Sequence, residues 1–308
     1  MILKTENLTK EYSSKNGCFN INLEIEKPIV FGLLGPNGAG KSTLVKTLVG
    51  LLRPTRGKAF LLGKPFDDIV IKSKIGYLPE NFKYPDWMTA YEVMEFHCQL
   101  LKMKNYKNEI YSLLEKVGII EHKDKKIRLF SKGMQQRLGL AVSMLNRPEI
   151  IFLDEPTSAL DPIGRIDVRN IIIELKNQGT TVFLNSHLLS EVEKVCDKVA
   201  IINKGYIVAM GTIDELTRKA LKVTFVLDKV DSKLFEIISL KNINILNHSQ
   251  TTLELELSSH EDVPILVEEF VRSGYKIYEV KKSQELENVF LQVIGEGYFD
   301  VGNNKILF

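Results

Sequence analysis

The chain has 308 residues, of which 44% are hydrophobic and 26% are charged, a composition typical of a folded globular protein with about two domains. Its 41 lysine and arginine residues nearly balance 39 aspartate and glutamate residues, and this formal charge of +2 argues against a protein that wraps nucleic acid. No segment approaches the roughly 18 consecutive apolar residues of a membrane span, and residues 1–7 turn polar too early for a signal peptide. The sequence therefore predicts neither a spanning helix nor export by that route.

Short apolar runs and longer helical segments alternate from the N-terminus to about residue 215. Three runs with almost no charge predict buried strands: residues 29–34, 150–153 and 180–184. Continuous rather than alternating apolarity is typical of parallel strands that helices cover on both faces. Three amphipathic segments with no strand among them predict helices: residues 91–103, 107–117 and 133–145. We expect an α/β core over residues 1–219 that contains an inserted helical subdomain at about residues 82–147.

The remaining residues, 220–308, have a different pattern. Residues 222–227 and 252–257 alternate between apolar and polar side chains, as strands with one buried face do. Further segments predict a helix, a strand and a closing helix in turn: residues 263–272, 275–280 and 285–294. This pattern predicts a small, separate α+β domain. The cysteines Cys18, Cys98 and Cys196 lie far apart along the chain, and their spacing favours reduced, structural thiols.

A glycine-rich motif follows the first buried strand. Gly35-Pro36-Asn37-Gly38-Ala39-Gly40-Lys41-Ser42 matches G-x-x-x-x-G-K-[ST] in full, and a helix with an apolar face is predicted directly after it. The glycines let backbone N–H groups converge on phosphate oxygens, and the positive end of the helix dipole points to the same anion. Lys41 supplies a charge to the outer phosphates, and the Ser42 hydroxyl can bind Mg²⁺. We assign this motif and the adjacent Thr43 to nucleotide binding.

Two acids end the second buried strand, in Ile150-Ile151-Phe152-Leu153-Asp154-Glu155. Open α/β sheets bind ligands at the carboxyl ends of their strands, where these two side chains are expected. Asp154 suits the role of holding Mg²⁺ directly or through water. Glu155 is the better candidate for orienting or deprotonating the attacking water.

A third motif, Phe130-Ser131-Lys132-Gly133-Met134-Gln135-Gln136-Arg137, lies between the other two. Ser131 and Gly133 stand at the start of a predicted helix, a position that binds anions. Together the three motifs resemble those of the ATP-binding cassette (ABC) ATPases over roughly residues 1–220, and this motif resembles their LSGGQ-type signature. The resemblance implies that Ser131, Lys132 and Gly133 cap the γ-phosphate of ATP bound by a second subunit, in a head-to-tail dimer. Lys132 and Met134 depart from the signature's glycine and glutamine.

The resemblance also implies roles for single residues elsewhere. Tyr12 corresponds to the aromatic residue that stacks on adenine, and Asp161 to the loop through which two subunits sense each other. His187 corresponds to the switch histidine that contacts the γ-phosphate. Glu80 ends Ile75-Gly76-Tyr77-Leu78-Pro79-Glu80, where the family has the glutamine of its Q-loop, and an acid there can approach Mg²⁺ or water.

The function implied is that of an ATPase subunit that uses ATP and Mg²⁺. Closure and reopening of a dimer, with itself or with a homologous cassette, would drive an integral membrane permease. The chain would then be cytoplasmic, held at the inner face of the cell membrane by that permease. The final segment Gln284-Glu285-Leu286-Glu287-Asn288-Val289-Phe290-Leu291 resembles the end of ATPases that serve ABC-2 type exporters, which favours export. The transported substrate is not encoded in these motifs.

Two alternatives remain open at this point. The cassette motifs alone also fit the ATPase of an importer. A soluble ABC ATPase that acts on ribosomes or nucleic acid is the other alternative, and the basic residues 122–128 favour it; no stable nucleic-acid binding is expected, because such charge runs are usually solvated. Large apolar side chains at Tyr84, Trp87 and Met88, next to Glu80, suggest where a permease docks.

Overall fold

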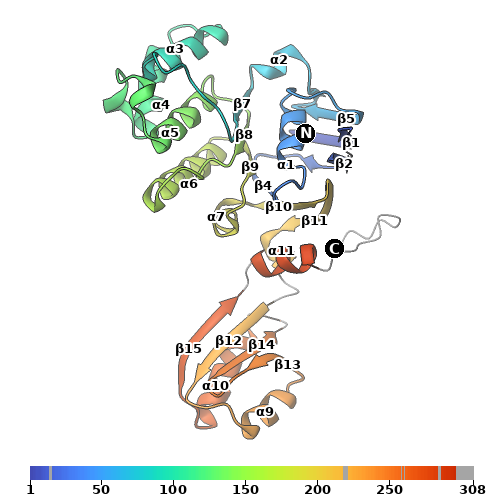
Figure 1. Ribbon diagram of the computed structural model, residues 1–308. Helices are drawn as coiled ribbons and strands as arrows, with labels where there is room; N and C mark the ends of the chain where they lie inside the picture. The colour runs from blue at the N-terminus through green and yellow to red at the C-terminus, as the bar shows by residue number, and fades with distance from the viewer. Residues whose placement is uncertain (14–15, 218–220, 258, 260, 284–285, 296–308) are drawn as a thin grey trace. The chain divides into compact units, whose positions relative to one another are not determined.

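The computed structural model describes residues 1–13, 16–217, 221–257, 259, 261–283 and 286–295. The chain divides into two compact units, Met1–Met210 and Gly211–Phe308, and Figure 1 colours the chain from blue at the N-terminus to red at the C-terminus. The sequence pattern places the boundary slightly later, between residues 219 and 220. None of the helices among the described residues is both long enough and apolar enough to cross a membrane.

A six-stranded sheet lies at the centre of the first unit, with the strand order β11-β10-β4-β9-β8-β7. Its strands are β4 (Val30–Leu34), β7 (Ile75–Leu78), β8 (Ile150–Asp154), β9 (Thr181–Asn185), β10 (Lys198–Asn203) and β11 (Tyr206–Thr212). The strands from β10 to β7 pair in parallel. Every residue of β4, β8 and β9 is buried, which confirms the three strands predicted from uninterrupted apolarity.

A second sheet, of five strands, precedes and flanks the first helix. It contains β1 (Leu3–Glu11), β2 (Gly17–Ile21), β3 (Glu24–Ile25), β5 (Arg56–Leu61) and β6 (Lys64–Pro65), all paired antiparallel. The prediction that strands and helices alternate from the N-terminus is wrong here, because four strands come before the first helix. These strands bury only one face and are broken by register shifts in β1, so they lack the uninterrupted apolar run of the central strands.

The helix α1 (Lys41–Leu48) packs within one hydrophobic core that both sheets share. Its buried side chains Leu44, Val45 and Leu48 belong to the same cluster as Leu3 of β1 and Phe152 of β8. The phosphate motif before α1 is therefore positioned by a helix that is fixed from two sides. The short helix α2 (Ile69–Lys72) follows β6.

The helices α3 (Ala90–Leu100), α4 (Lys107–Lys116) and α5 (Lys132–Ser143) lie together, apart from α1, in Figure 1. Two single turns of 3₁₀ helix, Ile120–His122 and Ile127–Leu129, connect α4 to α5. All three predicted helices of this region are confirmed, with ends that differ by at most three residues. After β8 come α6 (Pro162–Asn177) and, after β9, α7 (Leu189–Val195).

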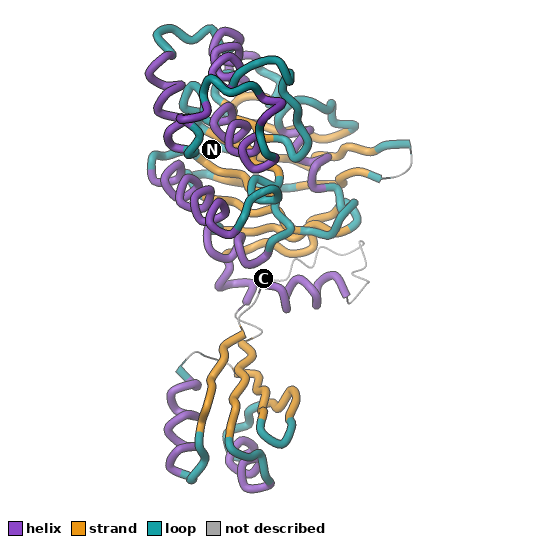
Figure 2. The backbone as a smooth tube through the Cα atoms, turned by 60° about the vertical axis from the view of Figure 1, so that its left-hand side comes forward, coloured by secondary structure: helices purple, strands orange, loops and turns teal. Residues whose placement is uncertain are grey.

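The second unit contains a four-stranded antiparallel sheet, whose strands are orange in Figure 2. Two helices, Ser232–Ser239 and Asp262–Arg272, share one hydrophobic core with this sheet. Its elements in chain order are α8 (Ile213–Thr217), β12 (Leu221–Leu227), α9 (Ser232–Ser239), β13 (Asn244–His248), β14 (Thr252–Leu257), α10 (Asp262–Arg272), β15 (Ile277–Ser283) and α11 (Leu286–Gly295). From β12 to β15 they form a βαββαβ arrangement with the strand order β13-β14-β12-β15. The sequence predicts β12, β14, β15, α10 and α11 but misses α8, α9 and β13. Residues 284 and 285 of the exporter-like closing segment lie outside the described residues.

Candidate nucleotide-binding and hydrolysis site

The phosphate loop between β4 and α1 depends on glycine backbone geometry. Gly38 and Gly40 have φ angles of 79° and 102°, a region that side chains with a Cβ rarely adopt. A Cβ on Gly40 would lie 2.3 Å from the carbonyl oxygen of Gly17, so this position also excludes any side chain by contact. With these backbone angles, the N–H groups of the loop and the start of α1 can converge on one anion, as phosphate binding requires.

Lys41 is the first residue of α1 and is only 8% exposed. Its Nζ donates to the carbonyl oxygens of Gly35, at 2.7 Å, and Pro36, at 3.1 Å. Burial lowers the pKa of Lys41, whereas the negative charges of Glu155, Asp154 and Glu80 act to raise it. The ammonium group is thus held at the phosphate loop and interacts electrostatically with three acids from other segments. Lys41, Glu80, Asp154 and Glu155, four of the predicted site residues, therefore act on one another.

Asp154 ends β8 and is 1% exposed. It is paired in register with Asn185, which ends β9, and the Nδ2 of Asn185 donates a hydrogen bond to its Oδ1. Burial raises the pKa of Asp154, and the hydrogen bond from Asn185 partly offsets that rise. Oδ1 of Asn185 is buried and has no hydrogen-bond partner within the described part of the chain, so one acceptor stays free beside the carboxylate. Sequence reasoning missed Asn185, because a polar residue at a strand end carries no signal without its neighbour.

Glu155 adopts a left-handed backbone conformation, with φ of 54°. Its N–H donates to the carbonyl oxygen of Asn185 at 2.8 Å, and its own carbonyl accepts from Nε2 of Gln136 at 3.2 Å and from Oγ of Ser158 at 3.1 Å. Such a conformation is unfavourable for glutamate, and these hydrogen bonds hold it in place. Gln136, a buried residue of the predicted signature segment, thereby gains a structural role that its sequence position did not suggest.

The carboxylate of Glu155 contacts the predicted switch histidine. Nδ1 of His187 lies 2.8 Å from Oε2 of Glu155, whose side chain is 9% exposed, whereas the imidazole is 54% exposed. Burial raises the pKa of Glu155, while His187 opposes that rise. A raised pKa moves a carboxylate toward the range in which a general base works best near neutral pH. Two residues that are 32 positions apart in the chain are thus joined at the carboxyl ends of β8 and β9.

Two further groups on or after β7 act on this site. Glu80 is exposed, and its charge contributes to the pKa of Lys41, Asp154 and Tyr77. Burial raises the pKa of Tyr77 to about 12, with added contributions from Asp154 and Glu80. The Tyr77 hydroxyl is buried without a hydrogen-bond partner among the described residues. In the Ile75–Glu80 segment, the sequence motif pointed to Glu80 alone and gave no signal for Tyr77.

The donor set fits a magnesium ion that shares its coordination with phosphates and water. In the described part of the chain, no group of three or more His, Cys, Asp or Glu side chains could hold a metal without other ligands. A buried carboxylate at Asp154, with its pKa raised by burial, is a strong site for a cation, and Ser42 offers a hydroxyl. Mg²⁺ is usually held in this way, by one or two protein oxygens plus substrate phosphates.

Of the predicted signature residues, Ser131 and Lys132 are exposed and Gly133 is half-buried. Ser131 caps α5, since its Oγ accepts from the N–H of Met134 at 3.2 Å, and Lys132 is exposed. A Cβ on Gly133 would lie 3.4 Å from the carbonyl oxygen of Ala159, which places the start of α5 beside the loop that leads to Asp161. Asp161 caps α6 in the same manner, through a 2.7 Å hydrogen bond from the N–H of Gly164. Within one chain, α5 lies among the helices away from α1 (Figure 1).

Tyr12 lies just past the end of β1, with 40% of its surface exposed. Nζ of Lys10 lies 5.5 Å from the centre of its ring. The ring is therefore free to stack on a flat ligand. Of the docking residues suggested by the sequence, Trp87 is 69% exposed, but Tyr84 packs inward against Phe82 and His97, at 5.3 and 6.0 Å between ring centres.

The fold and this cluster define a P-loop nucleotide-binding protein, and comparison with known proteins identifies its family. Residues 18–158 match the ABC transporter family. The ABC transporter ATP-binding protein YxlF of Bacillus subtilis is 36% identical over 299 residues, 95% of this chain and 99% of the relative. The bacitracin transport ATP-binding protein BcrA of Enterococcus faecalis is 33% identical over 301 residues, 96% of this chain and 97% of BcrA. The chain belongs to the ABC transporter ATP-binding proteins, which confirms the resemblance expected from the motifs.

Other relatives and solved structures agree with this family. An ABC transporter ATP-binding protein of Nostoc sp. is 46% identical over 213 residues, and the chain spans 63% of its length and 56% of that of a Synechocystis relative. A solved ATP-binding subunit of an ABC transporter is 26% identical with a TM-score of 0.66, over 71% of this chain and 92% of that one. A solved ATP-binding cassette bound to ADP and Pi is 24% identical, and its TM-score is 0.64 over 68% of this chain and 98% of that one. This cassette shares the fold.

Proposed function

We propose that this chain binds ATP at the Gly35–Thr43 loop and hydrolyses it with Glu155 as the general base. The convergence of Lys41, Asp154, Glu155 and His187 at one sheet edge carries this proposal. Glu155 takes a proton from the attacking water at its carboxylate, and its raised pKa supports that role. The exposed imidazole of His187 contacts this carboxylate at 2.8 Å and would also contact the γ-phosphate. Tyr12 stacks on the adenine.

Magnesium would be held by Ser42 and Asp154, with Glu80 near its water shell. When bound, the ion neutralises charge on the β- and γ-phosphates. Asn185 keeps Asp154 ionised and oriented, because its amide donates to the carboxylate in a buried setting. Lys41, whose Nζ donates to the carbonyl oxygens of Gly35 and Pro36 at the phosphate loop, would donate to the phosphate oxygens of bound ATP.

We further propose that two cassettes close head to tail around two ATP molecules. Ser131, Lys132 and Gly133 are exposed or half-exposed at a helix N-terminus, and this end carries positive potential. Their own chain does not offer them a phosphate, since α5 lies apart from α1, so a second copy or a homologous cassette is the natural source. Asp161, in the loop beside Gly133, would then report closure to α6.

The partner that uses this motion is proposed to be an integral membrane permease, which would hold the chain at the inner face of the cell membrane. Trp87 is the exposed apolar side chain that best marks its docking surface. Backbone hydrogen bonds from Ile127 to Met88 and from Arg128 to Asp86 fix the segment that carries Trp87. Relatives that match nearly the whole chain are named for bacitracin transport, and this supports export of a compound of that kind.

A direct test combines nucleotide-dependent dimerisation with permease capture. With ATP, Glu155→Gln should shift from a 35.0 kDa monomer to a dimer in light scattering, whereas the same variant with Lys41→Ala added should stay monomeric. Trp87→Glu should lose the co-purifying permease but keep its ATPase rate, and Ile173→Glu, on α6, should keep both. Dimers without nucleotide, or full permease capture by Trp87→Glu, would contradict the corresponding step.

A further inference from the structure

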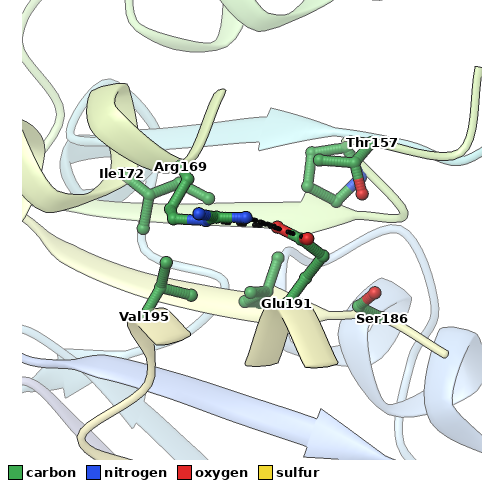
Figure 3. A pocket seen from close by; sticks show the side chains of 8 residues that line it. Thr157, Arg169, Ile172, Ser186, Glu191 and Val195 are labelled. Atoms are coloured by element: carbon green, nitrogen blue, oxygen red, sulfur yellow. Dashed lines mark hydrogen bonds and ion pairs between the residues drawn. The ribbon is translucent and has the colours of Figure 1, made fainter. Parts of the chain in front are cut away.

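An ion pair joins the two helices that follow the catalytic strands. Arg169 of α6 and Glu191 of α7 form a bidentate contact, in which Nη2 of Arg169 lies 3.0 Å from Oε1 and 2.9 Å from Oε2 of Glu191, and Nε lies 3.3 Å from Oε2. The two side chains are 21% and 14% exposed. Figure 3 shows them pointing directly at each other across a small pocket. Paired charges that are shielded from water in this way interact more strongly than pairs on the surface.

The pocket that this pair crosses is lined by residues that adjoin the hydrolysis residues in the sequence. Its lining includes Pro156 and Thr157, which follow Glu155, and Leu184 and Ser186, which flank Asn185 and precede His187. In Figure 3, Thr157 lies above and Ser186 below the dashed contacts, both toward the Glu191 end of the pair. The ion pair therefore braces the two segments that leave β8 and β9, just beyond the point where their acids and histidine meet.

The helix α7 starts close to the hydrolysis residues, and the N–H of Leu188, just before it, donates to Oγ of Ser186 at 3.1 Å. It has seven residues and begins two residues after His187, and Leu188 at its N-cap position provides no side-chain hydrogen bond. A helix this short is marginal without tertiary contacts. Its buried side chains Val192 and Val195 anchor the later turn, whereas Glu191 lies in the first turn, nearest to the histidine. Its partner Arg169 belongs to α6, a helix of 16 residues that follows the capping residue Asp161.

We propose that Arg169 and Glu191 are positioning residues for hydrolysis: their pairing holds the start of α7 so that His187 stays in contact with Glu155. This inference rests on the proposed function of those two residues. The pairing of β8 with β9 fixes where the segments that carry Glu155 and His187 leave the sheet. The ion pair between α6 and α7 holds the helices that follow these segments. Any displacement of α6 that starts at Asp161 is passed through the same pair to His187.

The test uses steady-state ATP turnover of the full chain with a double-mutant cycle. Arg169→Met keeps much of the side-chain volume but removes the charge, and we expect kcat to fall about tenfold or more while KM changes by less than about threefold. In a His187→Ala background, Arg169→Met should lower kcat by less than about twofold, because the residue that it positions is already gone. Arg169→Lys, with a single donor head, should retain an intermediate rate.

Two more variants separate positioning from general stability. The exchange Arg169→Glu with Glu191→Arg restores opposite charges and should recover most of the loss. Lys176→Met is the matched control, because Lys176 forms an ion pair with Asp197, at 2.6 Å, at the far end of the same helix; its kcat should match the parent. Thermal unfolding of each variant reports whether it folds.

The outcomes separate the positioning role of Arg169 and Glu191 from the proposed function itself. An Arg169→Met variant with parental kcat, or with an equal loss in both backgrounds, overturns the positioning role. If Arg169→Met fails to fold, the exchanged pair and Arg169→Lys decide, since recovery without the native residues requires the pairing itself. If the parent chain releases no phosphate from ATP, or Glu155→Gln retains the parental rate, the proposed function fails instead.

Discussion

Replacing Asn185 with alanine probes how the structure keeps a buried acid ionised. The amide of Asn185 donates to Asp154, which is 1% exposed. A hydrogen bond to a charged group contributes about 1.5–3 kcal/mol, so we expect Asn185→Ala to destabilise the first unit by about 2 kcal/mol. For a unit of about 200 residues, each kcal/mol lowers Tm by about 2–4 °C, which gives a shift of about 4–8 °C.

The same change should move the pH dependence of turnover. The hydrogen bond from Asn185 lowers the pKa of Asp154 against the effect of burial, so its loss raises that pKa and shifts the acid limb of kcat to higher pH. Calorimetry of Asn185→Ala with and without Asp154→Asn measures the pair, and the cost should fall to about 1 kcal/mol once the charge is gone. A Tm within about 1 °C of the parent, or an acid limb that does not move, would refute this reasoning.

Three other substitutions test separate parts of the account. Gly40→Ala should weaken ATP binding at least about tenfold in equilibrium titration, because φ of Gly40 is 102° and a Cβ there would meet the Gly17 carbonyl. Gly63→Ala is the control for backbone strain alone, since Gly63 has φ of 77° and a Cβ there would have no atom within 4 Å. This control should bind ATP as the parent does. Asp154→Asn should raise Tm at pH 8, since a carboxyl with a raised pKa loses stability as pH rises above its ordinary value; a fall in Tm there would contradict the assigned direction. The pKa of Asp231 is lowered to about 2, first by its hydrogen bond from Tyr275, so its stabilisation is present above its ordinary pKa and is lost as pH falls toward 2. The protection factors of the α9 amides, which correct for the intrinsic exchange rate at each pH, should therefore fall between about pH 4 and 2 in the parent but not in Asp231→Asn, and an equal fall in both would count against it.

The central sheet and the phosphate loop could be predicted because their signals are local. An uninterrupted apolar run needs no partner to be recognised, so β4, β8 and β9 were predictable within a residue or two. The glycine-lysine motif fixes its own geometry through backbone angles. In contrast, β1 pairs with β5, about 50 residues later in the chain, and β2 and β3 pair with β1. Pairing over such a distance cannot be read from a short window of sequence.

The candidate site was predictable only as separate residues. Asp154, Glu155 and His187 carry motif signals, but Asn185, Tyr77 and Gln136 acquire meaning only through contacts made across strands or between elements. The same holds for α9, whose eight residues follow a capping aspartate but lie between two strands without a long helical period. Pairwise contacts of this kind depend on register, and register follows from the whole sheet rather than from the local sequence.

Above all, we propose that Glu155 activates water for attack on ATP bound at the phosphate loop. The most direct measurement is phosphate release from ATP by purified Glu155→Gln, with bound nucleotide measured on the same samples. Removing a general base costs about 10²–10⁴ in rate, so the variant should hold intact ATP and release phosphate at no more than about 1% of the parental rate. Glu149→Gln, an exposed acid at the opposite end of β8, should retain the parental rate. Turnover by Glu155→Gln equal to that of Glu149→Gln would contradict the account.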